Sequence, residues 1–178
     1  MTKQLRITSN RFAFAALALA AAVAAGSVHA AVATASSTST VIAPIQISKV
    51  TDLSFGSFAP GATPGTVTIS PNSSRAVSGG VVAAGGTSTA AQFNVTGETG
   101  LNYSITLGGS ATLASGSDTM AFTSISDLSA SAATSGNVTS GTLSSGAQSI
   151  YVGGVLTVAA NQAAGTYTGS VTATVEYN

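Results

Sequence analysis

Cysteine and tryptophan are absent from this sequence of 178 residues, and its only histidine is His29. Without cysteine there is neither a disulfide nor a thiol nucleophile, so the core and the hydrogen bonds must hold the fold. The usual Ser-His-Asp and Cys-His arrangements also need a histidine, and His29 lies in a segment that we expect to be removed. We therefore predict that the protein is not an enzyme.

Charge is equally scarce, since only 6% of the residues are Asp, Glu, Lys or Arg. The acidic residues occur singly, and no pair has the spacing of a glycosidase dyad or a calcium loop. No glycine pair opens a helix in the manner of a phosphate-binding loop. We expect no metal and no cofactor.

The basic residues gather at the N-terminus. Lys3, Arg6 and Arg11 precede an unbroken apolar run, Phe12 to Ala25, and small residues follow up to Ala30. This three-part pattern predicts a secretory signal peptide over residues 1–30, cleaved after Ala30. The apolar run is shorter than the roughly 20 residues that cross a bilayer.

Removing the leader leaves Lys49 and Arg75 against five acidic residues, a formal charge of 2 − 5 = −3. Two basic residues are too few for a nucleic-acid surface or an anionic membrane surface. We expect neither partner, and no membrane insertion after cleavage.

The exported chain divides into two parts. Residues 31–40 are small and polar without a period, which predicts a flexible N-terminal extension. Residues 41–178 predict one domain made of short strands, with Pro44 placing residues 41–50 at an edge or a strand entry. Apolar and polar residues alternate in the expected strands 67–69, 92–96, 102–107 and 165–177. Further strands are expected at 53–58, 120–128 and 150–158, where apolar residues can share one face.

No segment of this domain has a sustained helical period, and each strand pattern buries one face. We predict an all-β fold, a Greek-key β-sandwich of immunoglobulin-like type. Residues 161–164 predict a hairpin between the last two strands. The Ser-, Ala-, Thr- and Gly-rich stretch 129–148 predicts an exposed, mobile loop that could bind a ligand.

The clearest strand is the last, Gly165 to Tyr177, in which every odd position is small, apolar or aromatic. Such a strand needs a sheet to cover it, from its own chain or from another molecule. A second idea concerns Lys49, which could form an isopeptide bond with Asn161 or Asn178 beside Glu176. Lys49 as an ordinary charge on an edge strand is the simpler alternative.

Several motifs resemble a bacterial family known as domain of unknown function 4402. They are Pro44-Ile-Gln-Ile47, Leu53-Ser-Phe-Gly-Ser-Phe58, Gly65-Thr-Val-Thr-Ile-Ser-Pro71, Tyr151-Val-Gly-Gly154, Gly165-Thr-Tyr-Thr-Gly169 and Val175-Glu-Tyr177. The resemblance covers the expected domain. It implies an exported small β-domain with no assigned activity.

The C-terminal strand also resembles that of chaperone–usher pilin subunits, which end in an alternating strand with a penultimate tyrosine and a glycine fourteenth from the end. Tyr177 and Gly165 occupy those positions. The resemblance implies an open groove that a periplasmic chaperone fills first and the N-terminal extension of the next subunit fills later. Carried over, the groove-facing residues are Gly165, Tyr167, Val171, Ala173, Val175 and Tyr177. The donor residues are Val32, Val41, Ile42 and Ile45.

The pilin cysteine pair is missing here, and residues 31–40 are poor in bulky apolar side chains. With these departures, the resemblance implies a pilin-like fibre subunit in a Gram-negative-type bacterium, acting in cell adhesion. Its partners would be copies of itself, a periplasmic chaperone and an usher. It would pass through the periplasm to the cell surface or the extracellular space. The alternative is a monomeric secreted or periplasmic binding module that uses its loops on a glycan or a surface.

Overall fold

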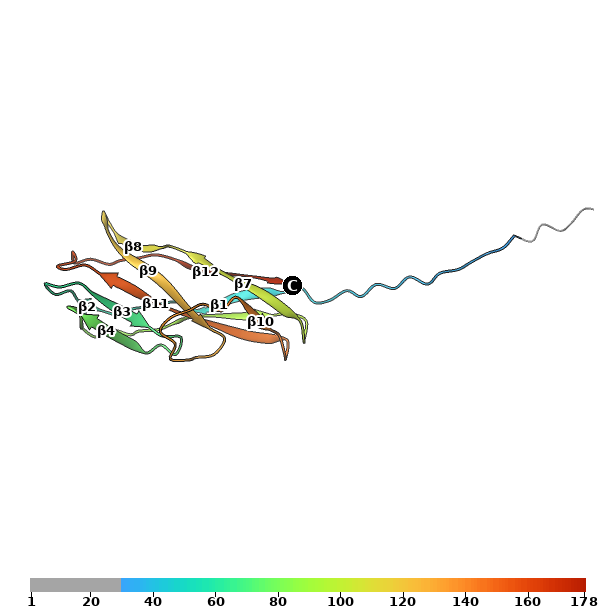
Figure 1. The fold of residues 1–178 in the computed structure, drawn as a ribbon, viewed down its shortest axis with the longest axis horizontal. Helices are drawn as coiled ribbons and strands as arrows, with labels where there is room; N and C mark the ends of the chain where they lie inside the picture. The colour runs from blue at the N-terminus through green and yellow to red at the C-terminus, as the bar shows by residue number, and fades with distance from the viewer. Residues whose placement is uncertain (1–29) are drawn as a thin grey trace, which may run out of the picture. The chain divides into compact units, whose positions relative to one another are not determined.

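A computed structural model describes residues 30–178, and Val41–Asn178 forms one compact unit (Figure 1). The described residues form strands, turns and irregular segments, and no helix. The strands in chain order are β1 (Gln46–Thr51), β2 (Phe58–Ala59), β3 (Gly65–Ile69), β4 (Arg75–Gly79), β5 (Val82–Ala83), β6 (Ala91–Thr96), β7 (Asn102–Gly109), β8 (Thr112–Ser115), β9 (Asp118–Asp127), β10 (Ser140–Thr142), β11 (Ala147–Val158) and β12 (Val171–Tyr177).

The larger sheet is built around β11, the longest strand. On one edge β11 pairs first with β6 and then with β3, while β9 runs along its other edge. β1 and β4 extend this sheet beyond β6 and β3, and β8 pairs with β9. Gly153 lies where β6 gives way to β3, and a Cβ there would collide with the carbonyl oxygen of Ile69. Glycine is therefore required for the close approach of the two backbones.

The smaller sheet has the order β10-β7-β12, and β2 pairs with β5 in a separate short ribbon. All pairings are antiparallel. Strands of the larger and the smaller sheet contribute to one apolar cluster, so these two sheets pack face to face. This architecture confirms the predicted all-β sandwich.

Two apolar clusters fill the sandwich. The first lies between β6 and β11 on one side and β7 and β12 on the other; its buried members are Ala91, Phe93, Val95, Tyr103, Ile105, Leu143, Ile150, Val152 and Val175. The second lies under β3, β9 and the end of β11; its buried members are Phe55, Val67, Ile69, Val81, Ala90, Met120, Leu156 and Val158. Each fully buried large aliphatic side chain contributes about 1.5–3 kcal/mol. The alternation read from the sequence identified many of these residues, among them Phe93, Val95 and Ile150, but not Leu143 or Val81.

The predicted hairpin across residues 161–164 is wrong. β11 pairs with β6, β3 and β9, whereas β12 pairs with β7 in the other sheet. The turn itself exists, since Asn161 has a φ of 51° and its N–H bonds to the carbonyl oxygen of Gly61. The chain then crosses between the sheets, because the apolar face of β12 is buried against the first cluster.

The stretch 129–148 departs from the expected exposed loop. It contains β10, and its Leu143 is fully buried in the first cluster. The N–H of Val138 also donates to the Ser126 hydroxyl at 2.9 Å. This stretch is therefore partly built into the domain, although most of its other side chains are exposed.

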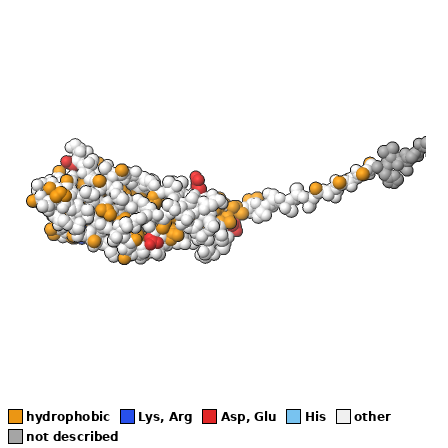
Figure 2. All heavy atoms as spheres, in the orientation of Figure 1, with side chains coloured by type: hydrophobic (Ala, Val, Ile, Leu, Met, Phe, Trp, Pro, Cys, Tyr) orange, Lys and Arg blue, Asp and Glu red, His pale blue; other side chains and the backbone are white. Residues whose placement is uncertain are grey.

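Residues 30–40 contain no strand, and their side chains are exposed. The predicted signal peptide lies outside the described residues except for Ala30. Within the described part of the chain there is no helix long and apolar enough to cross a bilayer. Figure 2 shows a surface with few charged side chains and scattered apolar ones, as the composition requires.

Candidate functional site: an apolar groove beside the C-terminal strand

β12 is an edge strand, and among the described residues it pairs only with β7. The ladder is bounded by two hydrogen bonds in the same register, from Ser110 N–H to the carbonyl oxygen of Ser170 and from Asn178 N–H to that of Asn102. Bonded and non-bonded pairs alternate along an antiparallel ladder. The even-numbered residues of β12 therefore bond to β7.

The odd-numbered residues consequently direct their N–H and C=O groups to the open edge; they are Val171, Ala173, Val175 and Tyr177. Their side chains point inward, where Val175 is buried and the other three are half-buried against the first cluster. At these four positions the apolar side chains face the core, and the backbone groups face the open edge without a partner. This combination is a template for an added strand.

A groove lies beside the start of this edge. It consists of two hollows of about 440 and 680 Å³ that share Leu53, Phe55, Leu113 and Tyr167. Residues 51–60 form one wall, and residues 162–171 form the other. Additional apolar lining comes from Ala91, Phe93, Met120, Phe122 and Leu156. Phe55 and Phe122 meet edge to face, with ring centroids 6.1 Å apart.

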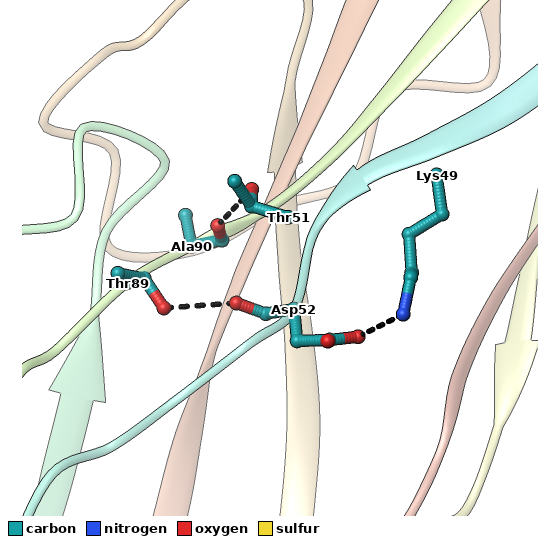
Figure 3. Close-up of polar contacts among 5 residues, drawn as sticks. All are labelled: Lys49, Thr51, Asp52, Thr89 and Ala90. Carbon is teal, nitrogen blue, oxygen red and sulfur yellow. Dashed lines mark hydrogen bonds and ion pairs between the residues drawn. The ribbon is translucent and has the colours of Figure 1, made fainter.

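The first wall begins where β1 ends, and hydrogen bonds hold it in place (Figure 3). The Thr51 hydroxyl donates to the carbonyl oxygen of Ala90 at 3.2 Å, and the Thr89 hydroxyl donates to that of Asp52 at 2.8 Å. Lys49 forms an ion pair with Asp52, at 2.6 Å between Nζ and Oδ1. Both of these charged side chains are exposed, so the pair adds little stability. The pair lies at the rim of the apolar groove and makes that rim polar.

Arg75 holds the next part of this wall. Its Nη1 donates to the carbonyl oxygens of Phe55, Ser57 and Gly85 at 3.1, 3.2 and 2.9 Å. Gly56, with a φ of 68°, makes the turn that brings those carbonyls together, and a Cβ there would collide with the guanidinium. One cation therefore fixes the segment that carries the groove residues Leu53 and Phe55.

The second wall is held mainly through Tyr167 and Thr168. Tyr167 Oη accepts from Gln162 Nε2 and donates to the carbonyl oxygen of Ala163, both at 2.8 Å. Thr168 and Ala114 exchange two backbone hydrogen bonds of 2.9 Å. Gly165 packs so closely on the Ser115 hydroxyl that a Cβ would collide with it. This wall therefore stands against β8 and holds the Tyr167 ring in the groove.

The residues predicted to face a groove lie along one face of the C-terminal segment. Gly165, Tyr167 and Val171 line the hollows, while Ala173, Val175 and Tyr177 continue along the open edge. Sequence reasoning missed the opposite wall, because Leu53 and Phe55 read as an ordinary strand face. The sequence around Leu113, which lies in β8, gave no signal that this strand would approach Tyr167.

The predicted donor residues fall into two groups. Val32, Val41 and Ile42 are 84%, 94% and 45% exposed. Ile45, by contrast, is half-buried and packs against the first cluster of its own domain.

The described residues offer little acid–base or metal chemistry. They contain no cluster of three or more His, Cys, Asp or Glu side chains that could hold a metal ion. Hydrogen bonds from Ser131 and Ser129 hold the pKa of Asp127 below its usual range, and burial raises the pKa of Tyr103. Neither group lines the groove.

The bonds observed at Lys49, Asn161 and Asn178 do not join these residues. The Lys49 ammonium is paired with Asp52, while the backbone N–H groups of Asn161 and Asn178 bond to the carbonyl oxygens of Gly61 and Asn102. The structure therefore gives no support to an isopeptide bond.

Fold and groove together define an antiparallel β-sandwich with an open edge beside an apolar groove. The family described as "Domain of unknown function (DUF4402)" matches residues 45–177, and the chain belongs to this family. The match begins near β1 and ends with the last residue of β12, so it spans both walls of the groove. Comparison with curated proteins and with solved structures found no match.

Proposed function

We propose that this protein is a non-enzymatic structural protein, a pilin-like subunit of a bacterial cell-surface fibre. An extended segment from another copy adds to the open edge of β12 and fills the groove beside it. The observation that carries the proposal is the position of the groove, since the unpaired edge and the apolar hollow share Val171. Strand addition needs both features, because main-chain bonds provide affinity and pockets provide specificity.

The physical cost of leaving this site empty supports the proposal. Val171, Ala173, Val175 and Tyr177 leave four N–H and four C=O groups without a strand partner, and Leu53 and Leu113 are only half-buried. Edge strands of this kind are usually blunted by charge, proline or a bulge. β12 carries Glu176 as its only charge and no proline, and its register with β7 is unbroken. Such an edge favours the capture of another strand.

The donor that we propose is the N-terminal extension of a second copy. Its side chains are exposed from Ala31 to Ile42, and at about 3.3 Å per residue it can reach roughly 40 Å when extended. The stretch from Tyr167 to Tyr177 would span about 36 Å at the same rise. The extension is therefore long enough to follow the second wall and β12 together.

The remaining partners and the localisation follow from the same proposal. A subunit with an open apolar edge would aggregate during export unless another protein covered it. A periplasmic chaperone would cover the edge, an usher would assemble the fibre, and the fibre would serve cell adhesion at the surface of a Gram-negative-type bacterium. The final location is the cell surface or the extracellular space.

Deletion of residues 31–40 tests the proposal. The exported chain should form heat-stable polymers on concentration, seen by light scattering after size exclusion, whereas the deletion variant should remain a folded monomer. That monomer should bind a synthetic peptide of residues 31–42, and excess peptide should block polymerisation of the full exported chain. A folded monomer both before and after the deletion, with no peptide binding, would refute strand complementation.

A further inference from the structure

The side chain of Tyr177 links the end of β12 to the segment that precedes β1. Its Oη accepts from the N–H of Glu98 at 2.6 Å and donates to the carbonyl oxygen of Ala43 at 3.0 Å. Glu98 Oε2 in turn accepts from the N–H of Ala43 at 3.0 Å. Both backbone groups of Ala43 are thus held by side chains from distant parts of the chain. We call Ala43, Glu98 and Tyr177 the Ala43 junction.

The local structure leaves room for this junction. A Cβ on Gly97 would collide with the Tyr177 hydroxyl, so only glycine lets the ring approach at this point. The N–H of Gly97 bonds to the carbonyl oxygen of Gly146 at 3.0 Å, which holds the turn leading to Glu98. The contact therefore depends on a glycine, a tyrosine and a carboxylate, each in its place.

The chain changes character on the two sides of Ala43. On the C-terminal side, Pro44 has no N–H to give, and Ile45 packs against the core of its own domain. On the N-terminal side, Val41 and Ile42 are exposed, and their backbones form no hydrogen bond within the described residues. Ala43 is therefore the most N-terminal residue that hydrogen bonds tie to its own domain.

We propose that the Ala43 junction is a positioning site that fixes the root of the donor extension. Residues up to Ile42 can then be given to a second copy, and Ile45 cannot. This inference rests on the proposed function, and it gives a physical reason why the donor segment ends at Ile42 and leaves out Ile45. Tyr177 contributes both to accepting an incoming strand and to holding the outgoing one. Its backbone groups lie on the open edge of β12, while its hydroxyl holds the extension of its own subunit. The incoming and outgoing strands therefore meet at one residue.

Hydroxyl removal tests the junction without depending on assembly. In the exported chain, Tyr177→Phe keeps the ring and should raise the hydrogen-exchange rate of the Ala43 amide at least tenfold. Glu98→Ala should do the same, whereas Glu98→Gln keeps an acceptor oxygen and should restore most of the protection. Tyr151→Phe is the matched control, since no hydrogen bond of its hydroxyl occurs within the described residues. Unchanged protection of Ala43 in Tyr177→Phe would overturn the proposal.

Substitutions on the two sides of Ala43 test the boundary. Val41→Asp and Ile42→Asp should leave the melting temperature of the monomer unchanged and reduce polymer formation at least tenfold. Ile45→Ala should lower the melting temperature, because it removes packing from the core. Polymers that tolerate aspartate at both 41 and 42 would refute the boundary at Ile42. If the wild-type chain never polymerises, the proposed function fails, and the exchange of the Ala43 amide still decides whether the junction holds the root.

Discussion

Proline placed at Ala173 separates strand addition from folding. The N–H of Ala173 faces the open edge, so Ala173→Pro removes no bond to β7. Proline is tolerated on the solvent side of an edge strand, and Thr172 before it is already extended. The stiffer unfolded chain also offsets part of any backbone strain. We expect the free energy of unfolding of the monomer to change by less than about 1 kcal/mol.

The same substitution should strongly weaken capture of a strand. It deletes one hydrogen bond to the incoming strand, worth about 1 kcal/mol. It also leaves a carbonyl oxygen of that strand facing the proline ring without a partner, which costs about 1–3 kcal/mol. The sum of about 2–4 kcal/mol corresponds to a roughly 30- to 1,000-fold weaker affinity. The assay is calorimetric binding of the peptide of residues 31–42 to the chain that lacks residues 31–40, with urea unfolding of the same samples.

Thr174→Pro is the matched control one position along β12. Its N–H faces β7, because the even-numbered residues of β12 are in the hydrogen-bonded pairs of the ladder. We expect it to destabilise the monomer by about 2–3 kcal/mol through the lost ladder bond and the unpaired carbonyl opposite. If Ala173→Pro binds the peptide as tightly as the wild type, or if it unfolds as easily as Thr174→Pro, the assignment of the open edge is wrong.

Three further substitutions test the walls and the core. Val171→Asp places a charge in the groove at a half-buried position, so peptide binding should fall at least tenfold. Circular dichroism should show that the fold persists. Unchanged binding would exclude Val171 from the interface. Arg75→Ala removes three hydrogen bonds and takes from the Phe55 carbonyl its donor, although the Ser57 and Gly85 carbonyls keep backbone donors. The melting temperature should fall by the equivalent of about 2–3 kcal/mol, and a shift no larger than that of the neighbouring Ala76→Ser would contradict the role of Arg75. Tyr103→Phe removes a fully buried hydroxyl that has no hydrogen-bond partner in the described structure, so stability to urea should stay level or rise, and a clear loss would reveal a hidden partner.

Alternation in the sequence predicted much of the fold, because the side-chain period of a strand depends only on local backbone geometry. It identified the buried faces of β6, β7 and β11 through pairs such as Phe93 and Val95, which are buried as expected. Shorter strands such as β8 were missed, since four residues with one large apolar side chain show no period. The loop around Leu143 was read as exposed because its neighbours are Ser, Gly and Thr.

Part of the candidate site was also readable from the sequence. The odd positions from Gly165 to Tyr177 were predicted to share one face, and the structure places them on the groove and the open edge. The opposite wall was not readable, since nothing near Leu53 or Phe55 records that Tyr167 will stand across from them. The hydrogen bond from Tyr177 to Ala43 joins residues 134 positions apart, and no local pattern encodes such a contact.

The sequence by itself determined that this domain is all-β and that its last strand has one apolar face, because both follow from composition and a period of two. Only the tertiary structure decided which strand β12 pairs with. The choice between a hairpin with β11 and a crossing to β7 depends on how two sheets bury their apolar clusters together. The same packing left the far edge of β12 unpaired beside a groove, which is a property of the assembled sheets and of no single strand.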